Sequence, residues 1–184
     1  MIPQEPIWIV TRVDGKIASV AADYRHFAAI AARLAEAGPA SAASVSAEKI
    51  STADLVALDA SVGWEDLRLF GSSFQKKVWK TLYDLTHGQK ALLYSYSDIA
   101  VLCENPLGVR AVAHAVALNP VAYIIPCHLV VPKESMDRSR EIRTQAEDST
   151  LFKGSDLYLL DTIDVGDYAY GPRLKRELIK IQMG

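Results

Sequence analysis

A proline at position 106 limits what the middle of this chain can fold into. Proline has no backbone N–H and restricts the residue before it, so a helix that reaches this point must end at about Asn105. Helical spacing nevertheless occurs on both sides. One short helix is predicted to start at Ser97, and another at about Gly108, running to Leu118 with its valines on one face. Two short helices joined by a tight turn have the form of a helix-turn-helix, although many such helix pairs do not bind DNA.

The residues around this helix pair divide the chain into two parts. In the first part, two strands joined by a tight turn are predicted at 7–13 and 16–20, followed by a helix at 24–37 and a loop or linker at 40–47. In the second part, Ser73 is expected to cap a helix that Gly88 closes. We therefore predict an α+β fold, with a small N-terminal support domain over residues 1–70 and a helical domain over 71–184.

One of the two cysteines lies at the end of an apolar, strand-like run over 119–131, directly after Pro126. Neighbouring side chains of a regular strand point to opposite faces, so Cys127 and His128 can cooperate only where the chain leaves the pleat, and the proline favours such a break. Cys127 is therefore a candidate nucleophile with an imidazole beside it. A buried structural thiol is the alternative interpretation, because free cysteine is among the most buried residue types.

Composition and charge argue against several other classes of site. The two cysteines stand 24 residues apart with no pair of histidines nearby, which argues against a zinc site and against a disulfide framework. No apolar stretch approaches the length needed to span a bilayer, so a soluble, cytoplasmic protein is expected. The net charge of -2 gives no overall attraction to nucleic acid. A DNA-binding face must then be a local basic patch, for which the candidates are Lys76, Lys77, Lys80, Lys90 and Arg110.

Four segments resemble motifs of the methylated-DNA-protein-cysteine methyltransferases, also called O6-alkylguanine-DNA alkyltransferases. They are Gly71–Trp79, Tyr96–Ala100, Asn105–Val112 and Asn119–His128, which are similar to the family patterns G-T-P-F-Q-x-x-V-W, Y-G-x-L-A, N-P-x-A-x-R-A-V and N-P…I-P-C-H. The resemblance is close over about residues 71–131, resumes at 168–182 and is only architectural over 1–70. It implies a ribonuclease H-like N-terminal domain followed by a winged helix-turn-helix domain.

The resemblance implies a repair reaction on double-stranded DNA that contains O6-alkylguanine. A flipped-out base would give its alkyl group, from O6 of guanine or O4 of thymine, irreversibly to Cys127. No metal or organic cofactor would be needed, and the protein would act once, as a monomer. His128 is the implied proton acceptor, Tyr96 the donor to the departing base, and Asn119 the residue that holds the turn before the nucleophile.

The resemblance also implies how DNA would be bound. Arg110 would enter the duplex from the minor groove and fill the place of the flipped base, while the small residues Gly108 and Ala111 would let the helix approach closely. The other expected DNA-binding residues are Asn105, Ser97 and Gln75, and the implied lining of the substrate pocket is Tyr168, Ala169 and Val131.

The chain departs from the family pattern in three places. Leu129 stands where the family has an arginine, and Gln182 stands where counting places the glutamate that orients the histidine. An amide cannot stabilise an imidazolium by charge, so a less ionised and slower Cys127 is expected. Between about 133 and 166 the chain carries extra residues, interpreted either as a disordered or edge-hairpin insertion, with a strand at 162–165, or as a lid near the pocket.

These departures leave more than one function open. The first is an active, single-turnover transferase that uses Cys127. The alternative is a non-enzymatic protein like the alkyltransferase-like proteins, which bind an alkyl lesion without repairing it but lack the cysteine. A winged-helix regulator that binds intact DNA fits the weakly basic composition less well.

Overall fold

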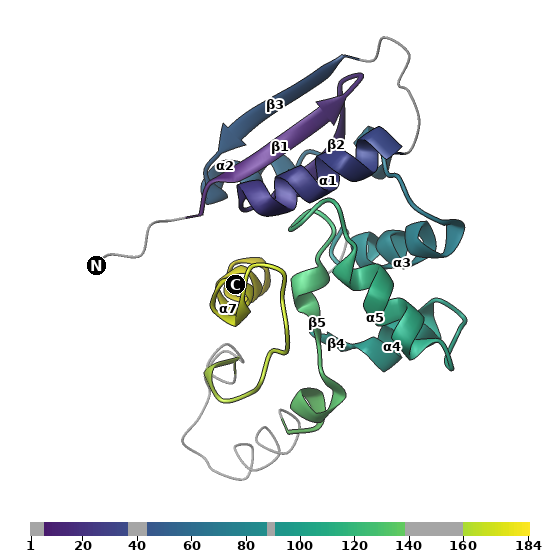
Figure 1. Cartoon of the computed structure of the whole chain (residues 1–184). Coiled ribbons are helices and arrows are strands. Elements are labelled where there is room, and N and C mark those ends of the chain that lie inside the picture. Colours follow the sequence, from purple (N-terminus) through teal and green to yellow (C-terminus); the bar gives the residue numbers. More distant parts are fainter. Residues whose placement is uncertain (1–5, 37–43, 88–90, 139–159) are drawn as a thin grey trace.

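The first part of the chain is built on a three-stranded antiparallel sheet with the strand order β2-β1-β3 (Figure 1). The structure is a computed structural model that describes residues 6–36, 44–87, 91–138 and 160–184. Strands β1 (Trp8–Val13) and β2 (Lys16–Ala21) form the predicted hairpin. Its turn residues Asp14 and Gly15 have φ angles of 51° and 77°, a region that glycine enters freely and aspartate more readily than most residues.

Helix α1 (Tyr24–Glu36) lies along one face of this sheet, between the strands and the second part of the chain (Figure 1). Strand β3 (Val45–Ile50) pairs with the free edge of β1, and helix α2 (Thr52–Asp59) follows it directly. The prediction of a loop over 40–47 is wrong from residue 45 onward, while 40–43 lie outside the described residues. Five of the six residues of β3 are exposed, so the strand has no apolar alternation by which to recognise it.

Helices α3 (Ser73–Asp84), α4 (Tyr96–Leu102) and α5 (Val109–Ala117) pack together in the second part. Ser72, and not the predicted Ser73, caps α3. Helix α3 also ends at Asp84, short of the predicted stop at Gly88, which lies outside the described residues. The indole Nε1 of Trp79 donates a hydrogen bond of 2.8 Å to the carbonyl of Ala115, which fixes α3 against α5.

The predicted tight turn joins α4 to α5, and α4 begins one residue earlier than expected, with Ser95 as its cap. Glu104 has a φ of 56°, which reverses the chain after α4. The backbone N–H of Gly108 donates to the carbonyl of Asn105 at 2.8 Å. A Cβ on Gly108 would lie 2.1 Å from Nδ2 of Asn105, so a glycine is needed here for close approach.

The apolar run over 119–131 is not a continuous strand. Only Val130–Val131 forms a strand, β5, which runs parallel to β4 (Tyr94–Ser95). Residues Cys127–Leu129 form a 3-10 helix, η2, whose preceding residue is Pro126, so the predicted break at the proline is confirmed. Further back, Val20 of β2 exchanges hydrogen bonds with the Pro120 carbonyl at 3.0 Å and the Ala122 N–H at 3.1 Å.

The C-terminal helix α7 (Pro172–Met183) packs against η2. Residues 133–138 are helical, and 139–159, most of the predicted insertion, lie outside the described residues. The predicted strand over 162–165 is wrong, because these residues form a turn and an irregular segment. The segment is nevertheless packed into the molecule. Buried residues of the segment form a second hydrophobic cluster with η2, β5 and α7, namely Leu160, Ile163 and Val165 with Leu129, Val131 and Ile179.

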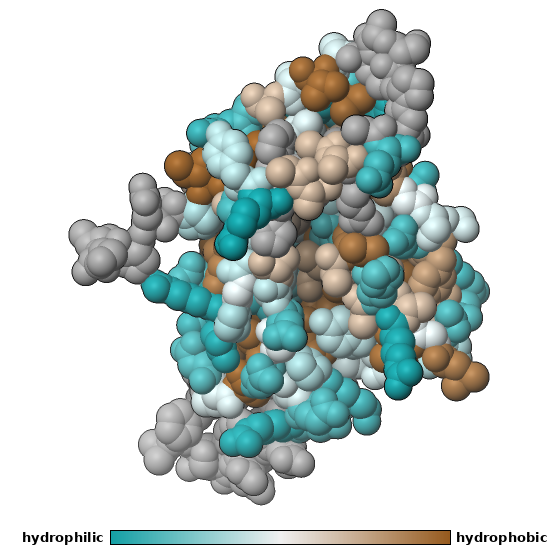
Figure 2. All heavy atoms as spheres, viewed as in Figure 1, coloured by the Kyte–Doolittle hydropathy of each residue, from teal (hydrophilic) through white to brown (hydrophobic). Residues whose placement is uncertain are grey.

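The two parts of the chain share one main hydrophobic core. It runs from Trp8 in β1 to Leu178 in α7 and includes residues of the sheet, of α3 to α5 and of the 121–127 segment. On the face shown in Figure 2, apolar side chains at the surface are interspersed with hydrophilic ones. No helix within the described ranges is long and apolar enough to cross a membrane.

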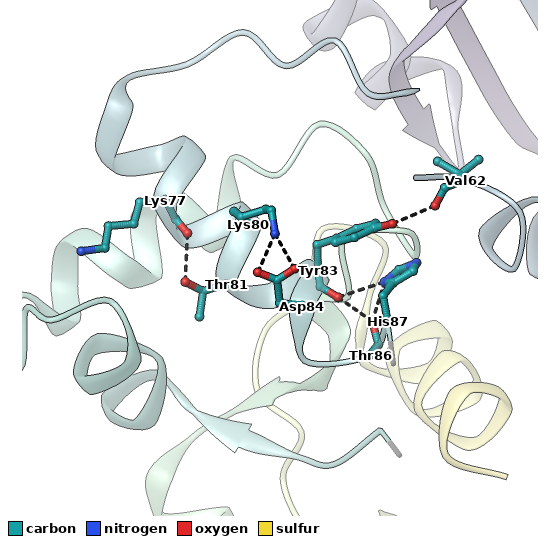
Figure 3. Close-up of polar contacts among 8 residues, drawn as sticks. All are labelled: Val62, Lys77, Lys80, Thr81, Tyr83, Asp84, Thr86 and His87. Carbon is teal, nitrogen blue, oxygen red and sulfur yellow. Dashed lines mark hydrogen bonds and ion pairs between the residues drawn. The ribbon is translucent and has the colours of Figure 1, made fainter. Parts of the chain in front are cut away.

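A histidine links the ends of α2 and α3. The ring of His87 stacks on Tyr83 with centroids 3.6 Å apart, and its Nδ1 lies 2.9 Å from the Tyr83 carbonyl (Figure 3). Its Nε2 lies 3.4 Å from Oδ1 of Asp59, the last residue of α2. Burial lowers the pKa of His87, but the hydrogen bonds and charge of Asp59 and the Tyr83 carbonyl outweigh it, so the net pKa is raised.

Candidate active site

A cavity of about 510 Å³ opens beside Cys127, between the N-terminal helix α1 and the second part of the chain. Its walls are mostly apolar and come from segments far apart in the sequence, as is usual for small-molecule sites. Of the three residues expected to line a pocket, Tyr168 and Ala169 do so, whereas Val131 is buried in the second hydrophobic cluster. The lining residues are Ala29, Tyr96, Val116, Ala117, Leu118, Asn119, Cys127, Asp167, Tyr168, Ala169 and Tyr170.

Asn119 holds the cysteine in the cavity wall. Its Nδ2 donates to the carbonyl of Ile125 at 2.7 Å and to Sγ of Cys127 at 3.1 Å, while its Oδ1 accepts from the N–H of Val121 at 3.0 Å. Burial raises the pKa of the Cys127 thiol, and the Asn119 hydrogen bond, the charge of Lys175 and Tyr168 each act to lower it. The thiol is therefore buried but faces groups that favour its anion.

His128 lies next to Cys127 in sequence but turns into the core. Its ring is fully buried and stacks on Tyr123 with centroids 5.5 Å apart, and Tyr123 itself has a φ of 73°, an uncommon conformation for a bulky residue. Burial lowers the pKa of His128 to about 3, an effect that the Gln182 amide opposes. Neither imidazole nitrogen, nor Oε1 of Gln182, makes a direct hydrogen bond with a described residue.

Three tyrosines surround the thiol. Burial, and then the charge of Cys127, raise the pKa values of Tyr96, Tyr168 and Tyr170, so each phenol keeps its proton near neutral pH and can act as a donor. Tyr168 and Tyr170 meet edge to face, with centroids 5.4 Å apart, and Tyr170 makes a similar contact with Trp8 of the N-terminal sheet at 6.0 Å. The sheet therefore supports one wall of the cavity.

The expected DNA-binding residues fall into two groups. Arg110 and Ala111 are exposed on the first turn of α5, next to the turn that Asn105 and Gly108 shape. Ser97 and Gln75 instead lie at helix starts: the Oγ of Ser97 is 2.8 Å from Oγ of Ser95, and Gln75 belongs to the capping box of α3.

The basic patch considered above is partly neutralised. Lys77 pairs with Glu104. Figure 3 shows Lys80 paired with Asp84 within α3. Lys90 lies outside the described residues, while Lys76 is exposed. Within the part of the chain that is described, no group of three or more His, Cys, Asp or Glu side chains is placed to hold a metal ion.

Lys175 is a residue near the site to which sequence reasoning assigned no role. It appears in the segment that resembles the family, but a lysine on a helix is usually a solvated residue, and only its burial distinguishes it. Tyr170 was missed in the same way. Its contact with Trp8 of the N-terminal sheet joins residues far apart in the chain, so no local signal was available.

Part of the chain is similar to known proteins. Residues 73–148 match the family model described as the DNA binding domain of 6-O-methylguanine DNA methyltransferase. A probable methylated-DNA--protein-cysteine methyltransferase of Acanthamoeba polyphaga mimivirus is 49% identical over 70 residues, which are 38% of this chain and 45% of the relative. The methylated-DNA--protein-cysteine methyltransferase of Haemophilus influenzae is 39% identical over 64 residues, 35% of this chain and 34% of the relative. The match thus spans less than half the length of either relative.

A solved structure shares the fold over nearly the whole chain. The O6-methylguanine-DNA methyltransferase of Pyrococcus kodakaraensis superposes with a TM-score of 0.60 at 21% identity, covering 99% of this chain and 95% of that one. The likeness covers the small N-terminal sheet as well as the helices of the second part, and it supports a mixed α/β fold. Over residues 73–148, the chain is therefore similar to the DNA binding domain of the 6-O-methylguanine DNA methyltransferase family.

Proposed function

We propose that this chain repairs double-stranded DNA by taking an alkyl group from O6 of guanine, or O4 of thymine, onto Cys127 and keeping it, acting as a monomer. The observation that carries the proposal is the position of Cys127, in the wall of a cavity, hydrogen-bonded by Asn119, within the domain that matches the family. We assign residues 1–70 to a ribonuclease H-like support domain and residues 71–184 to a winged helix-turn-helix domain.

The reaction proposed is a single displacement. The thiolate of Cys127 attacks the alkyl carbon, a sulfur–carbon bond forms, and the carbon–oxygen bond breaks with its electron pair left on the base. Tyr96, which keeps its proton, donates a hydrogen bond to the departing guanine. His128, whose pKa is lowered to about 3, passes the thiol proton on through water and stays neutral itself, with Gln182 beside it. Because a thioether is not hydrolysed, each molecule reacts once.

DNA binding is proposed to centre on the start of α5. An alkyl group on O6 is inaccessible inside the base stack, so the nucleotide must be flipped into the cavity. Arg110 is exposed on the first turn of α5, and the absence of a side chain on Gly108 together with the small side chain of Ala111 permits close approach to a groove. We expect Arg110→Ala to weaken binding to lesion and intact DNA alike.

The deciding experiment uses a duplex oligonucleotide that carries O6-methylguanine with a labelled methyl group. We expect one label per protein molecule, lost completely in Cys127→Ala. Cys103→Ala is the matched control, because Cys103 is the other buried thiol and lies outside the cavity lining, so it should label fully. Tight lesion binding without label would overturn the proposal in favour of a non-enzymatic lesion-binding protein.

A further inference from the structure

Lys175 is a buried cation held behind the nucleophile. It lies on the first turns of α7 and is only 1% exposed. Its Nζ donates to the carbonyl of Val130 at 2.7 Å and to that of Asp167 at 3.3 Å. Val130 follows η2, which carries Cys127, and Asp167 lines the cavity. Two carbonyls from the two sides of the site therefore fix the position of the ammonium group.

The charge of this ammonium is not cancelled by an ion pair within the described residues. Asp164 and Asp167 act on it only through the electrostatic effect of their charges, which favours the protonated form. Burial lowers the pKa of Lys175 to about 8, while Cys127, Asp164 and Asp167 act to raise it, so the group is mostly protonated at pH 7. Burying an ammonium without a directly ion-paired carboxylate is costly, which makes a purely structural use of this lysine unfavourable.

Lys175 supplies the positive charge near the thiol, because His128, Gln182 and Leu129 are uncharged. His128 stays neutral because burial lowers its pKa to about 3, and Gln182 brings no carboxylate that would favour the imidazolium. Leu129 is apolar and buried in the second hydrophobic cluster. Among the described residues, Lys175 is the charged group whose field favours the Cys127 thiolate, alongside the neutral groups of Asn119 and Tyr168.

We propose that Lys175 is the positioning residue that makes Cys127 reactive, by placing a fixed ammonium charge behind the thiolate in the role that a charged histidine cannot fill here. The inference rests on the proposed function for its purpose, but the ionisation of the thiol is measurable without DNA. A role confined to packing would leave the ionisation of Cys127 unchanged.

The test is the rate at which iodoacetamide alkylates Cys127 as a function of pH, followed by mass spectrometry of the Cys127 peptide. In this reaction the thiol loses its proton to the buffer, the thiolate attacks carbon, and iodide leaves. We expect Lys175→Gln, which keeps a donor for the carbonyls but loses the charge, to move the midpoint up by about one pH unit. This corresponds to alkylation about tenfold slower near neutral pH. A wild-type profile in Lys175→Gln would overturn the proposal.

Lys180→Met is the matched control, because Lys180 lies on the same helix, is more exposed and pairs with Asp161. Its profile should agree with wild type within about twofold. An equal shift in both variants would overturn the proposal, since any loss of charge from α7 would then suffice. This assay contains no DNA, so its failure and a failure of methyl transfer from the oligonucleotide are distinguishable.

A second measurement tests the proposal without the Lys175→Gln variant, in case that variant does not fold. The thiolate favours the ammonium as much as the ammonium favours the thiolate. In Cys127→Ala, the side-chain NMR titration of Lys175 should therefore move to lower pH than in wild type. An unmoved titration would mean that the two groups do not interact, and the proposal would fall.

Discussion

At the scale of single residues, one amide performs two tasks. Nδ2 of Asn119 donates both to the Ile125 carbonyl, which shapes the turn, and to Sγ of Cys127, which favours the thiolate. Asparagine is the side chain suited to this position because it also accepts, through Oδ1, from the N–H of Val121. The turn and the reactivity of the thiol are thus set by the same side chain.

Replacing Gln182 by glutamate tests the proton acceptor. A carboxylate beside His128 would stabilise the imidazolium, so the pKa of His128 should rise from about 3 and the pH midpoint of Cys127 alkylation should fall. Alkyl transfer should become several-fold faster at pH 7. The measurements are the iodoacetamide profile and single-turnover transfer from the labelled duplex. Unchanged profiles would show that Gln182 does not act on His128.

At the scale of elements, prediction succeeded where a local signal was strong. The Asp-Gly hairpin, the break at Pro126 and the helix-turn-helix shape at Asn105 depend on backbone chemistry that is visible in the sequence. Strand β3 was not predicted, because its exposed residues show no alternation of apolar and polar side chains. The run at 119–131 resembled a strand, but its hydrophobicity reflects the burial of a turn and a 3-10 helix.

The candidate site was predictable only in part, for a related reason. Motifs in register identified Cys127 and Asn119, which lie together in the cavity wall. The burial of Lys175 and the edge-to-face contact between Tyr170 and Trp8 depend on residues distant in the chain, which no local pattern encodes. Tertiary contacts of this kind can be identified only from the three-dimensional structure.

The turn before α5 provides a prediction at the same scale. Gly108→Ala places a Cβ 2.1 Å from Nδ2 of Asn105, so either the turn or the Asn105 side chain must move. We expect a loss of about 1–3 kcal/mol of unfolding free energy and weaker DNA binding. Urea denaturation measures the first and fluorescence anisotropy with a labelled duplex the second.

A double variant supplies the control for this steric argument. Asn105→Ala removes the obstructing amide, so the combination of Asn105→Ala with Gly108→Ala should cost less than the sum of the single changes. Additive losses would mean that the backbone of the turn, and not the Asn105 side chain, excludes a Cβ at position 108.

At the scale of the whole molecule, the N-terminal part is joined to the site by more than its chain connection. The edge of β2 hydrogen-bonds to residues 120 and 122, directly after Asn119, and Trp8 contacts Tyr170 in the cavity wall. The shared core runs through both parts. The N-terminal sheet is therefore in direct contact with the segments that form the cavity wall.

The contact between His87 and Asp59 predicts how the stability of the folded chain depends on pH. Because the pKa of His87 is raised in the folded state above its ordinary value of 6.5, its contribution to stability is complete below that value and is lost as pH rises through the folded-state pKa. Urea unfolding of wild type and His87→Gln should therefore differ most near pH 6 and converge in alkaline buffer. A gap that stays constant with pH would contradict the prediction.

The short parallel pairing of β4 with β5 predicts how the reactivity of the thiol is lost when the protein is warmed. Tyr94 pairs with Val130 and Ser95 with Val131, so Tyr96 follows one strand directly and Cys127 lies shortly before the other. These two pairs of residues thus set the spacing between the phenol of Tyr96 and the thiol of Cys127. Since so small a ladder opens at lower free energy than the shared core, loss of thiol reactivity on warming should precede the melting of the molecule.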